Sequence, residues 1–341
     1  MKKFFALLTA VLLVASLAAC GGDSNSSGGS TGGDSQTSGD SGSSGGSTGG
    51  GKLTFGTGGE QGTYYAFGTV IAQAISNETG TSITAVTSGG SQDNIDMMDM
   101  GSYQLGFVQS DVMSYAYEGT NLFAESGAIT GFSTVAALYM EQVQLVTLDP
   151  SIKSVADLAG KNVSIGASGS GVYYNALDVL GVYGLSEDDI NPTYQDFGNS
   201  VDSLTDGKID AAFVVAGAPT TAVTTLAASR DMYLVSLDQE HIDKLIEVSP
   251  YYSPYTISAD VYGTAEDCTT VAVGAVIIAR DDVSEDDVYN VVSTIFEKGT
   301  DLAHDKANEL DMDFATSITN IPYHPGAARY FSEKGVEVPV K

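Results

Sequence analysis

A glycine-rich loop between a short strand and a helix is the feature that most constrains this chain. Residues 52–55 (KLTF) alternate as a strand does, and residues 66–75 place their apolar side chains on one helical face. The loop between them, residues 56–65, reads GTGGEQGTYY. Glycine lets a backbone come close to a ligand, and free N–H groups at a helix start attract anions. The segment therefore predicts a cradle for an anionic group on a ligand.

The same order of elements returns later in the chain. Residues 163–165 predict a strand, and residues 166–174 (GASGSGVYY) form a Gly/Ser loop that ends in a tyrosine pair and enters a helix. We call residues 56–65 the first cradle and residues 166–174 the second cradle. An internal repeat of this kind predicts two similar lobes that hold one small molecule between them.

The N-terminal part of the chain predicts export and anchoring rather than a folded domain. Residues 1–19 have a charged start and an apolar stretch that is too short to span a membrane comfortably. They end in LAAC, which resembles the lipobox of bacterial lipoproteins and implies lipidation at Cys20; an ordinary secretory signal with a chance cysteine is the alternative. Residues 20–51 then form a Gly/Ser-rich tether that has no means of building a core.

The composition excludes some classes of binding partner. The chain has 14 basic and 43 acidic residues, a formal net charge of −29, and such a surface repels nucleic acid and anionic lipid headgroups. The two cysteines are Cys20 and Cys268, so the mature protein has no intramolecular disulfide if Cys20 is lipidated. We interpret Cys268 as a small, partly buried residue.

The fold class predicted for the remaining residues, about 290 of them, is α/β with two lobes. Strands alternate with helices, which indicates a largely parallel sheet whose ligands lie at the carboxyl ends of the strands. Two crossover segments are expected, an apolar one at residues 132–148 and a Pro- and Tyr-rich one at residues 250–260. The expected boundaries are residues 52–142 plus 260–341 for lobe 1 and residues 143–259 for lobe 2.

The sequence contains few of the residue patterns that catalysis requires. His241 and His304 lie in charged, helix-like surroundings, and His324 precedes a proline, where a helix cap or a structural hydrogen bond is expected. The glycine spacing of the first cradle misses the dinucleotide-binding pattern by one residue, and no nucleophile elbow or phosphate-binding loop motif is present. We therefore predict no enzyme, no cofactor and no metal site; a surface-anchored hydrolase would be revealed by turnover of a substrate panel.

Binding a ligand requires only hydrogen-bonding groups in the right place, and such groups lie at the predicted strand ends. Small hydroxyls and amides gather there, while the three arginines, Arg230, Arg280 and Arg329, all lie outside the cradles. The tyrosine pairs can line the ligand-binding site, with one member of each pair packed into its own lobe. The competing interpretation is that each polar loop only caps a helix, with Ser91 as the N-cap of the helix at residues 95–100.

Several motifs together are similar to the solute-binding subunits of TRAP transporters, the TAXI family. They are FGTG with GTYY in the first cradle, TSGGS with Asn94, and FVQSD followed by YAYEG at residues 115–119; the closing HPGA at residues 324–327 fits as well. The resemblance covers residues 52–335. It implies a type II periplasmic-binding-protein fold with two crossings, and capture of glutamate, glutamine or a related dicarboxylate such as 2-oxoglutarate.

The partners that this resemblance implies are a small anionic or zwitterionic solute, a TRAP permease in the membrane, and the membrane itself through Cys20, on the outer face of the bacterial cytoplasmic membrane. An alternative is a lipid-anchored sensor that works with a membrane signalling protein. Val172 stands where the family often has threonine, which removes one hydroxyl and leaves the ligand's identity open. The candidate ligand-binding residues are Thr57, Gly58, Gly62, Thr63, Tyr64, Tyr65, Ser91, Asn94, Gln109, Ser110, Ser168, Ser170, Gly171, Val172, Tyr173 and Gly217.

Overall fold

The computed structural model describes residues 50–341. The predicted signal peptide, the lipidation at Cys20 and nearly all of the predicted tether lie outside the described residues. Within residues 50–341, no helix combines the length and the apolar character that a membrane crossing requires.

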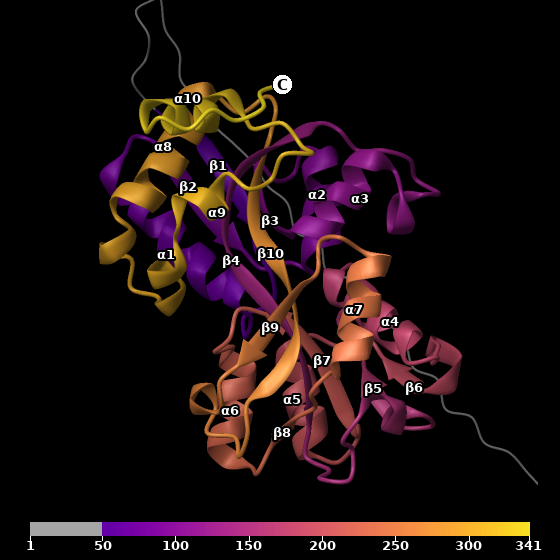
Figure 1. The fold of residues 1–341 in the computed structure, drawn as a ribbon. Helices are drawn as coiled ribbons and strands as arrows, with labels where there is room; N and C mark the ends of the chain where they lie inside the picture. The colour runs from indigo at the N-terminus through magenta and orange to yellow at the C-terminus, as the bar shows by residue number, and fades with distance from the viewer. Residues whose placement is uncertain (1–49) are drawn as a thin grey trace, which may run out of the picture. The chain divides into compact units, whose positions relative to one another are not determined.

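A single mixed sheet runs through both lobes (Figure 1), in the order β2-β1-β3-β10-β4-β7-β5-β6, with β8 paired to β4 and β9 to β10. Its short strands in lobe 1 are parallel: β1 pairs with both β2 and β3. In lobe 2, β5 is likewise parallel to β6 and β7. The strands of the sheet are β1 (Lys52–Gly56), β2 (Ser82–Val86), β3 (Leu105–Gln109), β4 (Phe132–Thr147), β5 (Asn162–Ser164), β6 (Asn191–Thr193), β7 (Ala211–Ala216), β8 (Tyr233–Leu234), β9 (Ser253–Ile257) and β10 (Cys268–Arg280).

Helices cover both faces of the sheet in each lobe (Figure 1). The α-helices are α1 (Thr63–Glu78), α2 (Ser91–Asp99), α3 (Ser110–Glu118), α4 (Gly171–Val182), α5 (Phe197–Thr205), α6 (Thr221–Ser229), α7 (Gln239–Val248), α8 (Glu285–Glu297), α9 (Met312–Ala315) and α10 (Pro325–Glu333). Short 3-10 helices connect them: η1 (Asn121–Phe123), η2 (Val155–Leu158), η3 (Glu187–Asp189), η4 (Ala259–Val261), η5 (Gly299–Asp301) and η6 (Asp305–Glu309).

Alternation along the central strands divides the apolar side chains between two cores in each lobe. On β3, Phe107 packs with α1 and α8, while its neighbour Val108 packs with α2 and α3 on the other face. On β7, Phe213 and Val214 divide in the same way between the two faces of lobe 2. Successive strand residues point to opposite faces, so a continuously apolar strand is what a sheet covered on both sides requires. The predicted α/β, two-lobed, periplasmic-binding-protein-like fold is confirmed.

Two long antiparallel strands, β4 and β10, carry the chain between the lobes. The first crossing lies where the sequence predicted it. The return crossing does not lie in the Pro- and Tyr-rich segment, because β9 pairs with β10 and Tyr252 packs into the core of lobe 2 together with Val271 and Val273. The chain returns to lobe 1 only along β10, later than the expected boundary at residue 260.

Local contacts settle three smaller predictions. Ser91 is the first residue of α2 and not its N-cap; the cap is Gly90, whose φ of 117° favours glycine, and the Ser91 hydroxyl accepts from the Gln109 amide at 3.1 Å. His324 does cap a helix, since its Nδ1 accepts from the Gly326 amide at 3.2 Å at the start of α10. Cys268 is buried, and burial raises the pKa of its thiol to about 11, so it is an unreactive core residue.

Candidate ligand-binding site

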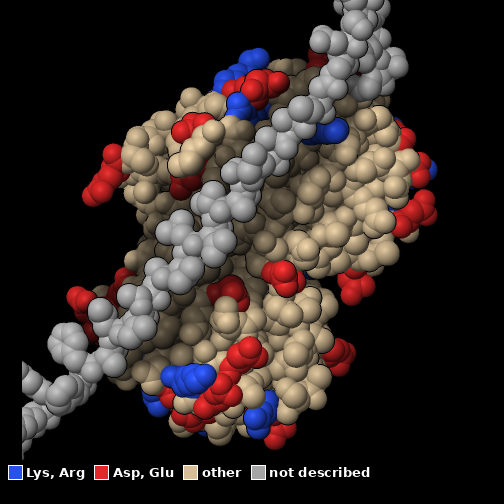
Figure 2. Space-filling view, turned by 180° about the vertical axis from the view of Figure 1, so that it is seen from behind, with Lys and Arg blue, Asp and Glu red and all other residues tan. Residues whose placement is uncertain are grey.

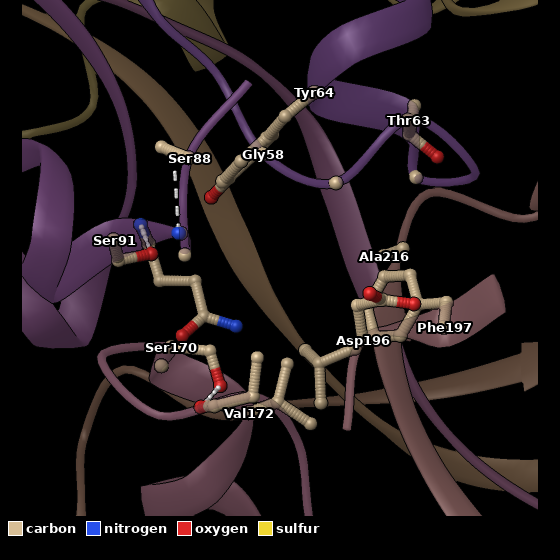
Figure 3. Close-up of a pocket in the computed structure, with 18 of the residues that line it drawn as sticks. Gly58, Thr63, Tyr64, Ser88, Ser91, Ser170, Val172, Asp196, Phe197 and Ala216 are labelled. Carbon is tan, nitrogen blue, oxygen red and sulfur yellow. Dashed lines mark hydrogen bonds between the residues drawn. The ribbon is translucent and has the colours of Figure 1, made fainter. Parts of the chain in front are cut away.

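The two cradles meet at one cavity between the lobes (Figure 3). It contains about 550 Å³ of empty space, part of it open to solvent. Both lobes contribute to its wall. The lining residues of lobe 1 are Gly58, Gly59, Gly62, Thr63, Tyr64, Ser88, Gly89, Gly90, Ser91, Gln109 and Glu141. Those of lobe 2 are Ala167, Ser170, Gly171, Val172, Asp196, Phe197, Val215 and Ala216.

Three of the helices that begin at this cavity have no side-chain cap among the described residues. The N-caps of α1, α2 and α4 are Gly62, Gly90 and Ser170, and no side chain of these three residues accepts a hydrogen bond from its helix. Another helix that begins at the cavity, α5, is capped by Asp196, and α7 and α8, elsewhere in the molecule, are capped by Asp238 and Ser284. Uncapped helix starts present free N–H groups and the positive end of the helix dipole. The cavity therefore provides anion-binding groups from both lobes without a basic side chain.

Charged side chains around the cavity are acidic. Glu141 and Asp196 line it, and no lysine or arginine of residues 50–341 does. Figure 2 shows the same imbalance on a larger scale, with acidic side chains more frequent than basic ones on that face of the molecule. Asp196 is exposed and serves as the N-cap of α5, where it accepts from the Asn199 amide at 2.8 Å.

Glu141 was not predicted, and it is the most unusual residue of the site. It lies on β4 and is 2% exposed, and the Tyr64 hydroxyl donates to its Oε2 at 2.6 Å. Burial raises the pKa of Glu141 to about 8, and the hydrogen bond from Tyr64 opposes part of that rise. The signal in the sequence was an acidic residue inside an apolar crossover strand.

The two members of each tyrosine pair have different surroundings. Tyr64 lines the cavity, and its ring stacks on Phe107 with centroids 4.7 Å apart, which holds it against the core of lobe 1. Tyr65 is half-buried and does not line the cavity. In the second pair, Tyr173 turns into lobe 2 and donates to Glu187 at 2.8 Å, while the Tyr174 hydroxyl donates across the cleft to Gln92 at 3.3 Å.

The cavity brings together nine of the sixteen candidate ligand-binding residues. They are Gly58, Gly62, Thr63, Tyr64, Ser91, Gln109, Ser170, Gly171 and Val172. Figure 3 shows Tyr64 and Ser91 on the lobe 1 side and Ser170 and Val172 on the lobe 2 side.

Seven candidates do not line the cavity, and the side chains of three of them have structural partners. The Thr57 hydroxyl donates to the Val86 carbonyl at 2.6 Å, and the Asn94 amide donates to the carbonyls of Thr57 and Phe107. The Ser110 hydroxyl accepts from the Gly274 amide at 3.0 Å. These side chains fasten the loops that form the cavity. Tyr65, Ser168, Tyr173 and Gly217 also lie outside its lining.

Direct hydrogen bonds between the lobes show a closed arrangement. The Thr63 hydroxyl donates to the Gly217 carbonyl at 2.8 Å, and the Asp93 amide donates to the Gly169 carbonyl at 3.0 Å. Behind the cavity, the buried Lys306 of lobe 1 donates to the Ala218 carbonyl of lobe 2 at 2.7 Å. Gly217 thus contributes to closure through its backbone.

A buried side-chain network around Asn175 also joins the lobes. Asn175 lies on α4; its Nδ2 donates to Asp111 of lobe 1 at 2.9 Å and to the Tyr252 hydroxyl at 2.8 Å, and its Oδ1 accepts from Gln109 at 3.0 Å. Tyr252 in turn donates to Asp178 at 2.9 Å. Burial raises the pKa of Asp111 to about 6, so this carboxyl is ionised at neutral pH.

Removing the hydroxyl of Thr63 is expected to weaken closure modestly. Thr63→Val keeps the shape of the side chain and loses one buried interlobe hydrogen bond, worth about 1 kcal/mol or roughly fivefold in the dissociation constant of a captured solute. Gly217 keeps a second donor, the Thr220 hydroxyl at 3.1 Å, so its carbonyl is not left unpaired. Thr69→Val, on the exposed side of the same helix, is the control, and titration calorimetry of both variants measures the difference. Equal affinities for the two variants would contradict this role.

The comparisons with known proteins agree with this architecture. Residues 55–335 match the NMT1-like family, and the chain belongs to that family. The alkanesulfonate-binding protein SsuA from Xanthomonas axonopodis pv. citri, solved bound to MOPS, is similar in structure, with 18% identity, a TM-score of 0.50, and coverage of 82% of this chain and 83% of that chain. A protein from Bordetella bronchiseptica RB50 is 16% identical, with a TM-score of 0.50 and coverage of 77% and 76%. At these identities the likeness shows the fold.

Proposed function

We propose that this chain is the extracytoplasmic solute-binding subunit of a TRAP transporter of the TAXI type. The observation that carries the proposal is the convergence of three uncapped helix starts, from both lobes, on one cavity without a basic side chain. Such a cavity suits a small acid held by main-chain N–H groups. The motifs shared with the TAXI family favour glutamate, glutamine or a related dicarboxylate such as 2-oxoglutarate as the solute.

Capture would proceed by hinge closure along β4 and β10, the two strands that connect the lobes. The solute docks on one lobe, and the other lobe supplies its contacts only when the cleft closes. The permease then recognises the closed shape and receives the solute. Lipidation at Cys20 would keep the protein on the outer face of the cytoplasmic membrane, within reach of the permease.

Titration calorimetry of the purified protein tests the solute class. Glutamate, glutamine and 2-oxoglutarate form the panel, with MOPS as an unrelated anion. Saturable binding of at least one panel member, and not of MOPS, is the expected result. Binding of none of the three would reject the proposed ligand class.

The transport partner needs a separate test. Membrane vesicles that contain a TRAP permease from the same organism should take up the bound solute only when the protein is added. Uptake should depend on an ion gradient and persist without ATP. Uptake that requires ATP would contradict the assignment to a TRAP transporter.

A further inference from the structure

Glu141 presents an unpaired carboxylate oxygen at the cavity. Its side chain is 2% exposed and lines the cavity, yet it lies among apolar residues of β4. Tyr64 donates to Oε2, and no donor within residues 50–341 lies at hydrogen-bond distance from Oε1. An ionised carboxylate in so little water is costly unless a positive charge or hydrogen-bond donors accompany it.

The basic residue near Glu141 binds other groups of the protein. Lys306 is buried, and its charge lowers the pKa of Glu141 slightly. Its ammonium group donates to the Ala218 carbonyl at 2.7 Å and to Glu309 at 2.5 Å. Glu141 therefore has no ion-pair partner in the part of the chain that the structure describes.

A second unpaired acceptor lies behind the cavity wall and is closed to solvent. Gln109 is 2% exposed, lines the cavity, and has a buried Oε1 with no donor among the described residues. The hydrogen bonds of Asn175 fix the orientation of the Gln109 side-chain amide. An ionised Asp111 only accepts, so Asn175 turns its amide nitrogen toward Asp111 and its oxygen toward Gln109. Gln109 must then donate with its nitrogen, which leaves its oxygen on the side of the second cradle, against Gly171.

We propose that Glu141 forms the subsite for an ammonium group of the solute, which makes the solute an α-amino acid rather than a 2-oxo dicarboxylate. This inference rests on the proposed function and deepens it. The solute carboxylate lies at the uncapped helix starts, and its ammonium group pairs with Glu141. A 2-oxo acid brings no cation and leaves Glu141 unpaired, so it binds less tightly.

The subsite couples binding to proton release. Burial keeps Glu141 protonated at neutral pH in the empty cavity, since its pKa is about 8, and an ammonium group pairs only with the ionised form. The titratable and charged groups around it are Tyr64 of α1, Asp111 of α3, Tyr139 of β4, Asp196 of α5 and Lys306 of η6. Asp111 is ionised at neutral pH because its pKa is about 6, and the two tyrosines stay protonated because burial raises their pKa values. Glu141 is thus the group that changes charge.

Calorimetry of the wild-type protein at pH 6, 7 and 8, in two buffers of different ionisation enthalpy, tests the inference. Protons compete with the ammonium group below the pKa of Glu141, so glutamate affinity should fall roughly fifty-fold from pH 8 to pH 6, with close to one proton released per glutamate at pH 6. Glutamate should bind roughly a hundredfold more tightly than 2-oxoglutarate at pH 8. Equal affinity for the two, or no proton release, would overturn the subsite while the solute-binding function stands. Binding of neither would reject the proposed function itself.

The matched variant is Glu141→Gln, which keeps the size and the hydrogen bond with Tyr64 but not the charge. We expect a roughly hundredfold loss of glutamate affinity, a flat pH profile and no proton release, with 2-oxoglutarate little affected. Glu240→Gln, which removes a carboxylate from the exposed surface of α7, should behave as the wild type does. A Glu141→Gln protein that still releases a proton on binding glutamate would overturn the assignment. The proton count of the wild type remains decisive if this variant fails to fold.

Discussion

Asn175→Leu is expected to weaken solute capture by at least a hundredfold while the lobes remain folded. Leucine has nearly the same size as asparagine and a good helix propensity, so α4 should persist. In the closed form, however, Asp111, Gln109 and Tyr252 each lose a buried partner. Each unsatisfied polar group costs about 1–3 kcal/mol, and more when it is charged. Asp111 and Gln109 belong to lobe 1 and reach water in an open form, so their penalty falls on closure, while Tyr252 keeps its hydrogen bond to Asp178 in either form.

Calorimetry and urea unfolding together separate these effects. The dissociation constant of glutamate should rise at least a hundredfold, and the urea midpoint of the solute-free protein should change much less. The matched control is Asn191→Leu, because Asn191 is exposed in lobe 2 and its side chain, among the described residues, bonds only to the Gly160 carbonyl. A solute affinity unchanged by Asn175→Leu would show that the network does not stabilise the closed form.

Gly171→Ala is expected to weaken capture by roughly a hundredfold, for a steric reason. A Cβ at this position would lie 1.6 Å from Gln109 Oε1 and 2.9 Å from Val112 Cγ2, both on the opposite lobe. Gln109 cannot swing away without losing its hydrogen bond to Asn175. Overpacking of this kind costs about 1–3 kcal/mol, and 2.7 kcal/mol corresponds to roughly a hundredfold in affinity. Within its own helix the alanine is favourable, so lobe 2 alone is not destabilised.

The same helix offers the control. Gly181, near the end of α4, has nothing within 4 Å of where a Cβ would lie. Gly181→Ala should leave binding unchanged and stabilise the protein by up to about 1 kcal/mol, because alanine is the better helix former. Calorimetry for binding and small-angle scattering for closure check both variants. A Gly171→Ala protein that binds and closes like Gly181→Ala would contradict the closed arrangement described above.

Much of the fold could be predicted from the sequence because its signals are local. The first cradle follows an alternating strand and precedes a helix with one apolar face, and the structure places β1, the loop and α1 in that order. Continuous apolar runs such as β7 indicate a strand buried on both faces, which α/β layering requires. The return crossing was misplaced because prolines and tyrosines mark an irregular segment but not the lobe that it packs against. Tyr252 belongs to lobe 2 through contacts that are distant in sequence.

The site was only partly predictable for a related reason. Glycines and small hydroxyls identified both cradles, since their role is local. Thr57, Asn94 and Ser110 have the same chemistry but fasten loops, and only their partners reveal it. Glu141 could not be predicted because the sequence does not show which side chains surround a single acidic residue on a strand. Asn175 could not be predicted because its partners come from two segments distant in sequence, residues 109–111 and Tyr252.

A crystal structure of the protein grown with glutamate tests the central claim most directly. We expect one glutamate between the cradles, with a carboxylate against the N–H groups at the start of α1, α2 or α4 and its ammonium group beside Glu141. Residues of the first and second cradles should both contact it. Glutamate bound outside this cavity, or held by one lobe with the other turned away, would contradict the account.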